Sequence, residues 1–461
     1  MLRQFAVFSL ACALVACAVL SAAAQTRVPP INFKERTLAN GLKVYTAQER
    51  TSPTVAIQVW YKVGSKDDPD KRSGFAHLFE HLMFKSTANM KDEMLDRLTE
   101  DVGGSNNAST NDDMTNYYEV VPSNYLETLL WAEADRMSTL NVNDKNFPSE
   151  RDVVKEEFNS GVLAPPYGRL FYALDKHSYT THPYSRPTIG SIEDLNAATL
   201  EDVKAFHKTF YRPDNAVLIV IGDYDDKQLD GWIDKYFGRI AKPAGTIPRV
   251  TVKEPERTAE KRFKETGPNV PLPAVAMTYL APPISSPDSD ALRVAESILA
   301  NGESSRLYQS LVYTQQLAVE SSAFASLRQD TGYFAFYAIL AGGKKVEDAE
   351  RALLGEVKKM QDAPVTKAEL EKAIIQLVAN QLRGRETNMG KAFAIGNAVV
   401  IMGDASRVNT DIERLQAVTA ADIQRVMKKY FTDANRVVIT YQAEAPKPAG
   451  ATGGAQKEGS R

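Results

Sequence analysis

The most informative stretch of this sequence is residues 74–87, which read G-F-A-H-L-F-E-H-L-M-F-K-S-T. Histidine is scarce, with five in 461 residues, yet His77 and His81 stand four positions apart here with Glu80 between them. This H-x-x-E-H spacing is typical of one class of zinc site. Residues four apart in a helix share a face, so both imidazoles can reach one tetrahedral ion. The stretch therefore predicts a helix that carries two zinc ligands.

The apolar residues of this helix support the same interpretation. At about 100° per residue they gather on one side: Phe75, Leu78, Phe79 and Leu82. His77, Glu80 and His81 fall on nearly the opposite side, so core packing belongs to the other face. Glu80 can then serve as a general base rather than as a ligand. A surface stripe of two histidines and a glutamate is the alternative.

The N-terminus has the pattern of an export signal over residues 1–24. A basic start precedes an apolar run from Phe5 to Leu20, and Ala22–Ala24 supplies an A-x-A cleavage site. We expect a periplasmic protein; the alternative is a lipoprotein anchored through Cys17, because Leu-Val-Ala precedes that residue. Cys12 is the other cysteine, so a cleaved soluble chain has no thiol to bind metal or form a disulfide. We expect no membrane-spanning helix after the signal.

A third zinc ligand is expected in residues 149–157, S-E-R-D-V-V-K-E-E, which begin with a helix-capping serine. On a helix, Glu157 shares a face with Glu150 and both valines, whereas Glu156 lies on the wetter side. An inward carboxylate among valines needs a partner, which is a metal ion or, alternatively, a buried ion pair. We expect Glu157 to be the ligand. Glu150 is expected to orient a ligand, or else to be a first-turn charge favoured by the helix dipole.

Composition sets the broad class of the protein. A chain of 461 residues, 43% hydrophobic, can bury large cores and should divide into at least two domains. Its 55 Lys and Arg residues against 58 Asp and Glu give a net charge of -3, without the basic excess that nucleic-acid binding uses. We therefore expect no nucleic-acid partner.

Hydrophobic periodicity predicts an α+β order of elements. Strands are expected at 42–47, 54–61, 115–121 and 215–221, and helices at about 72–86, 91–100, 123–138, 146–161 and 198–210. Residues 241–261 lack sustained periodicity and are expected to link two domains. Residues 444–461 are rich in Gly, Ala, Pro and Lys and are expected to form a disordered tail.

An internal repeat favours two related halves. Residues 199–221 align without gaps to residues 419–441, and both copies suggest a capped helix, a turn through Asn and a buried strand. Identical pairs include Thr199/Thr419, Asp202/Asp422 and Asn215/Asn435. We interpret this as duplication, although two common helix-strand units can also look alike by chance. The space between two such halves would suit a ligand.

These motifs together resemble the pitrilysin/insulinase family of inverzincin zinc metallopeptidases, and most closely its mitochondrial processing peptidase-like two-domain bacterial subunits. The resemblance rests on residues 74–87 and on E-R-D-V-V-K-E-E, whose second glutamate follows the second histidine by 76 residues. The stretches T-L-A-N-G-L-K-V-Y (37–45) and H-P-Y-S-R-P-T-I-G-S (182–191) extend it through nearly all of the mature chain.

The resemblance implies an α+β fold of two homologous α/β-sandwich domains, with LuxS/metallopeptidase-like halves that enclose a chamber for peptides. Residues 30–240 would be the catalytic zinc-binding domain and residues 262–443 the non-catalytic one. One Zn²⁺ per chain would be held by His77, His81 and Glu157, with Glu80 as the base. His177, His182 and His207 are expected to be structural or surface residues.

The family also implies a substrate-binding edge strand after the second helix. In this chain it falls on residues 104–110, with Asn106, Asn107, Ala108 and Ser109 at its centre. An edge strand can bind an extended peptide through main-chain groups. A polar loop is the alternative, because the composition is turn-like.

One departure from the family pattern bears on activity. By the resemblance, members that act as single chains carry a segment like L-R-x-x-x-Q-L-x-Y in the second half. Its Arg and Tyr reach across the chamber to the substrate carbonyl. Here Val312 and Val319 occupy those positions, and neither can donate a hydrogen bond. Arg306 and Tyr313 would replace them only in a shifted register. We expect a homologous subunit to supply the missing Arg and Tyr in a heterodimer.

The expected function is a zinc endopeptidase that hydrolyses peptides or unfolded segments, as the metal-bearing subunit of a heteromeric peptidase. The alternative is a non-catalytic scaffold or assembly subunit that keeps the peptidase fold. The intact zinc and base residues favour the enzyme, and the loss of the Arg and Tyr favours the scaffold.

Overall fold

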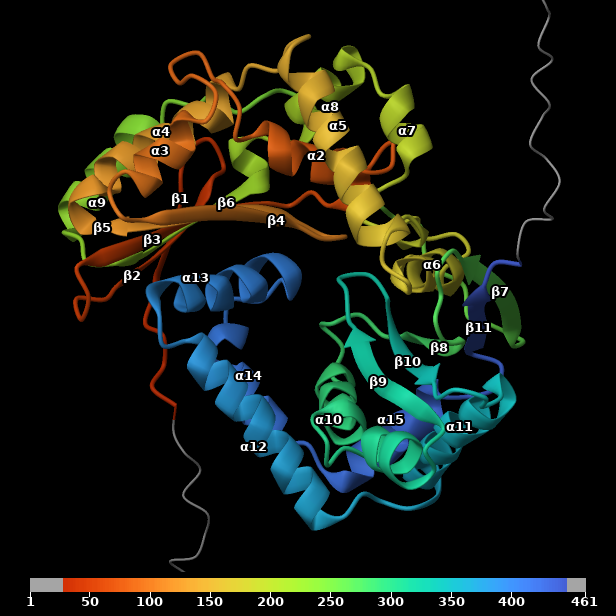
Figure 1. The fold of residues 1–461 in the computed structure, drawn as a ribbon. Coiled ribbons are helices and arrows are strands. Elements are labelled where there is room, and N and C mark those ends of the chain that lie inside the picture. Colours follow the sequence, from red (N-terminus) through yellow and green to blue (C-terminus); the bar gives the residue numbers. More distant parts are fainter. Residues whose placement is uncertain (1–27, 446–461) are drawn as a thin grey trace, which may run out of the picture. The chain divides into compact units, whose positions relative to one another are not determined.

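The computed structural model describes residues 28–445, and of these, residues 33–445 form one compact unit (Figure 1). The predicted signal segment, Cys12, Cys17 and all but the first two residues of the predicted tail lie outside the described residues. Within residues 28–445, no helix has both the length and the apolar character to span a membrane.

The first sheet has six strands in the order β1-β2-β6-β3-β5-β4. Their bounds are β1 Lys34–Thr37, β2 Lys43–Gln48, β3 Thr54–Tyr61, β4 Ser105–Thr110, β5 Thr115–Pro122 and β6 Ala216–Gly222. Strand β2 runs parallel to β6, and the other neighbours are antiparallel. The central strand β6, A-V-L-I-V-I-G, is buried along its whole length, as expected when both faces of a sheet are covered.

Apart from α6, the helices of the N-terminal half lie on one side of this sheet, and α13 lies against the other face (Figure 1). The helices of this half are α2 Phe75–Leu82, α3 Met94–Glu100, α4 Leu126–Thr139, α5 Asn146–Phe158, α6 Gly168–Ser178, α7 Ile192–Ala197, α8 Leu200–Phe210 and α9 Asp226–Tyr236. All five predicted helices are present, and each is shorter than predicted, the helix predicted at 72–86 most of all. Helix α5 is followed by a π-helical turn over Asn159–Leu163.

The second sheet has five strands in the order β7-β11-β8-β10-β9. Their bounds are β7 Lys261–Gly267, β8 Ala274–Ala281, β9 Ala318–Ser326, β10 Gly332–Leu340 and β11 Arg436–Ala443. The helices of this half are α10 Ser289–Ala300, α11 Val346–Asp362, α12 Lys367–Gly384, α13 Asn388–Gly396, α14 Arg407–Gln416 and α15 Ala420–Tyr430, with π-helical turns at Tyr308–Thr314 and Asn397–Ile401. The chain thus has two related α/β sheets, which confirms the predicted two-domain α+β class.

The predicted repeat corresponds to α8-β6 and α15-β11. Both helices begin with a capping box, Thr199 with Asp202 and Thr419 with Asp422. Each strand then lies between one parallel and one antiparallel neighbour. The two turn asparagines also act alike, because Asn215 Nδ2 donates to the Phe210 carbonyl (2.9 Å) and Asn435 Nδ2 donates to the Tyr430 carbonyl (2.7 Å). The identical pairs therefore hold the same turn in both halves.

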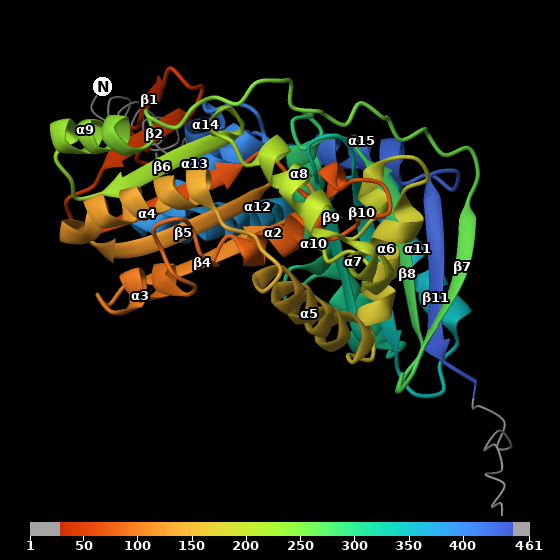
Figure 2. The same ribbon diagram turned by 90° about the horizontal axis from the view of Figure 1, so that it is seen from above.

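The predicted linker is an extended segment without helix or strand from residue 241 until β7 begins at Lys261 (Figure 2). Its side chains fasten it to backbone groups of both halves: Arg249 donates to the Lys62 carbonyl (2.7 Å), and Arg257 donates to the Asn435 carbonyl (2.7 Å). The segment is thus held in place along its length.

Two helices pack against the sheet of the other half. Helix α6 buries Leu170 and Leu174 against β8 and β11 of the second sheet. Helix α13 packs on β3 and β6 of the first sheet, where a Cβ at Gly396 would come within 2.2 Å of the Trp60 ring. Helices therefore pack across the sequence boundaries at 240 and 262.

Candidate active site

Helix α2 presents its two faces as the sequence predicts. Its apolar side is fully buried in the core of the first half: Phe75, Leu78, Phe79 and Leu82. His77, Glu80 and His81 are only partly buried. The core thus fixes the rotation of the helix about its axis, and that rotation leaves the polar residues accessible.

The start of α2 is set by Asp68, a residue that the sequence patterns do not mark. Its buried carboxylate accepts the backbone N–H groups of Gly74 (2.7 Å) and Ala76 (2.9 Å). Gly74 has a positive φ of 96°, a conformation that favours glycine. This cap explains why the helix begins at Phe75 rather than at residue 72. Asp68 stands six residues before Gly74, outside the local spacing of an ordinary N-cap.

Three side chains converge beside α2. The Glu157 Oε2 atom lies 3.5 Å from His77 Nε2 and 3.3 Å from His81 Nε2. One ligand atom from each residue lies within 4.8 Å of the others, and within residues 28–445 no other group of His, Cys, Asp or Glu side chains converges in this way. The structure therefore brings together the three residues predicted as zinc ligands.

The chemistry of these donors fits zinc. Two imidazole nitrogens and one carboxylate oxygen match a catalytic site that leaves a coordination position open. Burial, and to a smaller extent His81, lowers the pKa of His77 to about 4, so its imidazole is neutral with a lone pair free for a metal. Glu156, the rejected candidate, is exposed and accepts a hydrogen bond from Asn159 (3.4 Å).

The surroundings of Glu157 differ from the expectation in one respect. Val154 is fully buried, but Val153 is 41% exposed, so the carboxylate does not lie among two inward valines. Positions 150, 154 and 157 form one stripe of α5, and position 153 falls at its edge. Glu157 itself is half exposed on the open side of the site.

Glu150 lies behind His81. Its Oε2 atom is 3.9 Å from His81 Nδ1, and its Oε1 atom is 3.0 Å from Lys85 Nζ. The side chain is almost completely buried, so it is not a plain first-turn surface charge. Lys85, which sequence reasoning did not single out, balances its charge.

Glu80 lies between α2 and the edge of the first sheet. Burial raises the pKa of Glu80, and the nearby Glu157 adds to the rise. Hydrogen bonds with Thr110, the last residue of β4, and the charge of His81 act in the opposite direction. A carboxyl group with a raised pKa holds a transferred proton more readily than an unperturbed one, which suits a general base.

The predicted edge strand is β4, and it lies at the edge of the first sheet. It pairs only with β5, where Asn107 stands opposite Tyr118, so its other main-chain edge is unpaired within the sheet. Asn106 donates to Thr99 and Ser109 donates to Asn116 Oδ1 (2.6 Å), whereas Ala108 is buried. The alternative of a polar loop is wrong.

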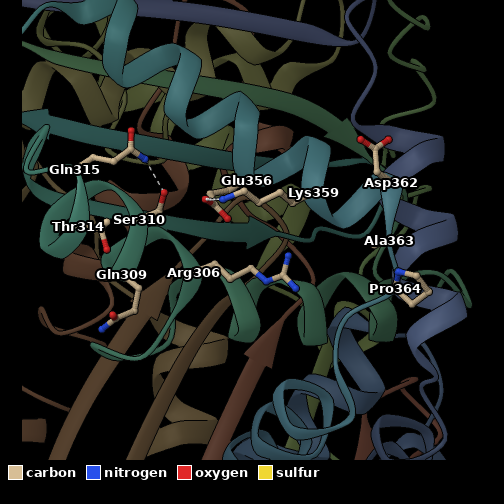
Figure 3. Close-up of a pocket in the computed structure, with 10 residues that line it drawn as sticks. All are labelled: Arg306, Gln309, Ser310, Thr314, Gln315, Glu356, Lys359, Asp362, Ala363 and Pro364. Carbon is tan, nitrogen blue, oxygen red and sulfur yellow. Dashed lines mark hydrogen bonds and ion pairs between the residues drawn. The ribbon is translucent and has the colours of Figure 1, made fainter.

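The residues at the family's Arg and Tyr positions lie in the second half. Val312 packs partly against the second core, and Val319 is 55% exposed on β9. Arg306 donates to both oxygens of Glu369 (2.7 and 3.0 Å), while Tyr313 is 71% exposed. Arg306 borders a hollow of about 730 Å³ that is lined by the π-helical turn Tyr308–Thr314 and by α11, and by none of the zinc-site residues. Figure 3 shows the side chains that line it.

The remaining histidines lie apart from this group. His177 stacks on Phe263 and contacts Glu265 (2.7 Å), and His182 is buried beside Tyr184. His207 is partly buried and stacks on Phe79 and Tyr211. All three fill structural positions, as expected from the sequence.

Comparisons with known proteins agree with this geometry. The family model "Insulinase (Peptidase family M16)" matches residues 43–191, and the model "Peptidase M16 inactive domain" matches residues 197–377. The zinc protease PqqE of Helicobacter pylori is 30% identical over 413 residues, which cover 87% of this chain and 91% of that protein. The probable mitochondrial-processing peptidase subunit beta of Arabidopsis thaliana is 26% identical, over 86% of this chain and 76% of that protein.

Solved structures extend the comparison to the fold. The crystal structure of a protease from Helicobacter pylori superimposes with a TM-score of 0.86 and 29% identity, and covers 90% of this chain and all of that one. A putative M16-like peptidase from Alicyclobacillus acidocaldarius has a TM-score of 0.78 and 20% identity over 90% of this chain and 99% of its own. By sequence and by fold, this chain belongs to the M16 family of zinc peptidases.

Proposed function

We propose that this chain is a zinc endopeptidase that hydrolyses peptides or unfolded polypeptide segments. The observation that carries the proposal is the convergence of His77, His81 and Glu157, with Glu80 on the same helix face. One zinc ion per chain would be held by the first three residues. When bound, zinc supplies Lewis acidity, which polarises a carbonyl group and makes water a better nucleophile.

The protein's own groups provide the proton transfers. Glu80 accepts a proton at its carboxylate from the attacking water and passes it to the nitrogen of the leaving amine. Its raised pKa suits the first step. Glu150, behind His81, would hold that imidazole in its ligating orientation, with Lys85 balancing its charge.

The substrate would bind as an extra strand along β4. The unpaired main-chain edge from Asn106 to Ser109 can hydrogen-bond an extended peptide without selecting its sequence strongly. Thr110, at the end of this strand, hydrogen-bonds Glu80, so a peptide on β4 would pass the base. This arrangement favours unfolded segments over compact domains.

The active form would be a heteromer in which a homologous subunit supplies an Arg and a Tyr. Val312 and Val319 cannot donate hydrogen bonds, and Arg306 is engaged by Glu369. Relatives named as beta subunits of the mitochondrial-processing peptidase support a subunit role. The two halves, proposed as domains 30–240 and 262–443, would enclose the peptide in a chamber.

A second candidate function is a non-catalytic scaffold or assembly subunit. The observation that favours it is the absence of hydrogen-bond donors at positions 312 and 319. The complete zinc and base set favours the peptidase, because a scaffold has no use for it. For location, the N-terminal sequence supports export to the periplasm, with a lipoprotein anchored through Cys17 as the alternative.

Cleavage of an unstructured, internally quenched peptide tests the proposal. The zinc-loaded chain should cleave it slowly alone, and at least about 10²-fold faster with a homologous subunit that carries the Arg and Tyr, because one oxyanion donor is typically worth that much. A chelator should stop both reactions and zinc should restore them. No cleavage under either condition would favour the scaffold, and full activity of the monomeric chain alone would contradict the heteromer.

A further inference from the structure

The second half contains a cavity of about 390 Å³ among helices α10, α12, α13 and α14. Three arginines line it, Arg293, Arg385 and Arg407, against the single carboxylate of Asp411. None of the proposed zinc-site residues borders this cavity, which we call the Arg385 pocket. Its volume lies at the small end of the range for ligand-binding pockets.

Two of the arginines are already neutralised. Asp411 accepts from Arg407 at Oδ1 (2.7 Å) and from Arg293 at Oδ2 (3.0 Å). Asp290, behind them, accepts from Arg293, Arg407 and Arg414. The carboxylates of Asp404 and Glu296 also lie near these arginines, so Arg385 is the arginine whose charge has no paired carboxylate among the described residues.

Arg385 is the lining arginine without a partner. Its guanidinium makes no hydrogen bond or ion pair with any residue in the described part of the chain, although the side chain is partly buried. Burial lowers the pKa of Arg385, and only the charge of Asp411 opposes this effect. A partly buried cation without a hydrogen-bonded anion is unfavourable, and a bound anion would relieve it.

The pocket lies close to the proposed active site. Phe393, which lines it, places its ring 4.9 Å from the ring of Tyr118 on β5. Tyr118 stands opposite Asn107 on the edge strand, and burial and, to a smaller extent, the charge of Glu80 raise the pKa of Tyr118. One aromatic pair therefore separates the pocket from the proposed peptide-binding edge.

We infer that the Arg385 pocket binds a carboxylate of the peptide substrate, either an acidic side chain or the C-terminal α-carboxylate. The inference rests on the proposed peptidase function, which it deepens by naming a substrate preference. Arginine suits this role because its planar guanidinium can donate two parallel hydrogen bonds to one carboxylate. The other two arginines stay paired with Asp411 and Asp290.

Equilibrium binding tests the pocket without turnover. The zinc-loaded Glu80→Gln protein would be titrated with fluorescent unstructured peptides in two matched pairs, one differing as Glu against Gln and one as free against amidated C-terminus. In at least one pair the carboxylate peptide should bind about 10-fold more tightly, the scale of a charge-assisted hydrogen bond. The pair that responds identifies the source of the carboxylate.

Three variants in the Glu80→Gln background test whether the difference in peptide affinity depends on Arg385 or on any change of charge at this helix end. Arg385→Gln should abolish the difference within the responding pair, and Arg385→Lys should keep part of it. Arg383→Gln is the matched control, because Arg383 is exposed on the same helix end and hydrogen-bonds only Asn380. It should leave the difference intact.

The outcomes distinguish this inference from the proposed function. Equal binding within both pairs, or a difference that survives Arg385→Gln, would overturn the inference even if the wild-type protein cleaves peptides. Carboxylate-selective binding that depends on Arg385, together with no cleavage by wild type with or without a homologous subunit, would overturn the peptidase proposal and leave a peptide-binding pocket.

Discussion

Helices α2 and α10 occupy the same place in two related sheets, because each is the next α-helix after the strand at the matching position, β3 or β8. Helix α2 carries His77 and His81, whereas α10 carries Arg293 and the partly buried Glu296, whose pKa burial raises to about 7. No histidine follows His207, so the second half cannot repeat the zinc site. Equivalent helices of the two halves thus carry different side chains, and these side chains rather than the fold decide the function.

The largest effect should come from removing a zinc ligand in the first half. His77→Ala and Glu157→Ala should each lose nearly all bound zinc, measured as metal per chain, because a three-ligand site loses a whole bond. Glu156→Ala is the matched control and should stay near one zinc per chain. Zinc loss from Glu156→Ala but not from Glu157→Ala would show that the ligand on α5 is misassigned.

A smaller effect is expected from the cap that starts α2. Asp68→Ala removes the buried carboxylate that accepts hydrogen bonds from the N–H groups of Gly74 and Ala76. The free energy of unfolding should fall by about 2 kcal/mol, and zinc affinity should fall with it because the helix start loosens. Urea denaturation and zinc titration measure the two effects.

Asp70→Ala is the control for this change, since the Asp70 side chain is fully exposed. It should alter neither quantity. If Asp68→Ala behaved like the control, the cap would not be what positions the two histidines.

The smallest effect tests whether the halves are true copies. Thr199→Ala and Thr419→Ala each remove the side-chain acceptor of an equivalent capping box. Each should cost about 1 kcal/mol of stability, by similar amounts, because the caps are equally exposed. A loss of stability in only one variant would mean that the repeated helix does not contribute equally to the stability of the two halves.

Most of the correctly predicted elements of the fold follow from hydrophobic patterns within single strands and helices. The strand predicted at 54–61 matches β3, and the strand at 115–121 matches β5 to within one residue. The helix face of Phe75, Leu78, Phe79 and Leu82 is buried as periodicity requires. These features follow from side chains that alternate or recur along one element, so a single sequence contains the signal.

Features made by distant contacts could not be predicted in this way. Asp68 caps a helix that begins seven residues later, through a loop whose path the periodicity does not specify. The arginines of the Arg385 pocket come from three elements separated by up to 114 positions, from Arg293 to Arg407. The exposure of Val153 depends on what packs beside α5, which helical phase alone does not decide.

The central claim is that Glu80 performs chemistry at a zinc ion held by its neighbours. The most direct measurement is the rate of cleavage of an unstructured peptide by Glu80→Gln beside wild type, both with the homologous subunit and with matched zinc content. The account predicts about one zinc per chain in both proteins and a rate at least about 10²-fold lower for Glu80→Gln, because an amide cannot accept the proton. Equal rates at equal zinc content would contradict it.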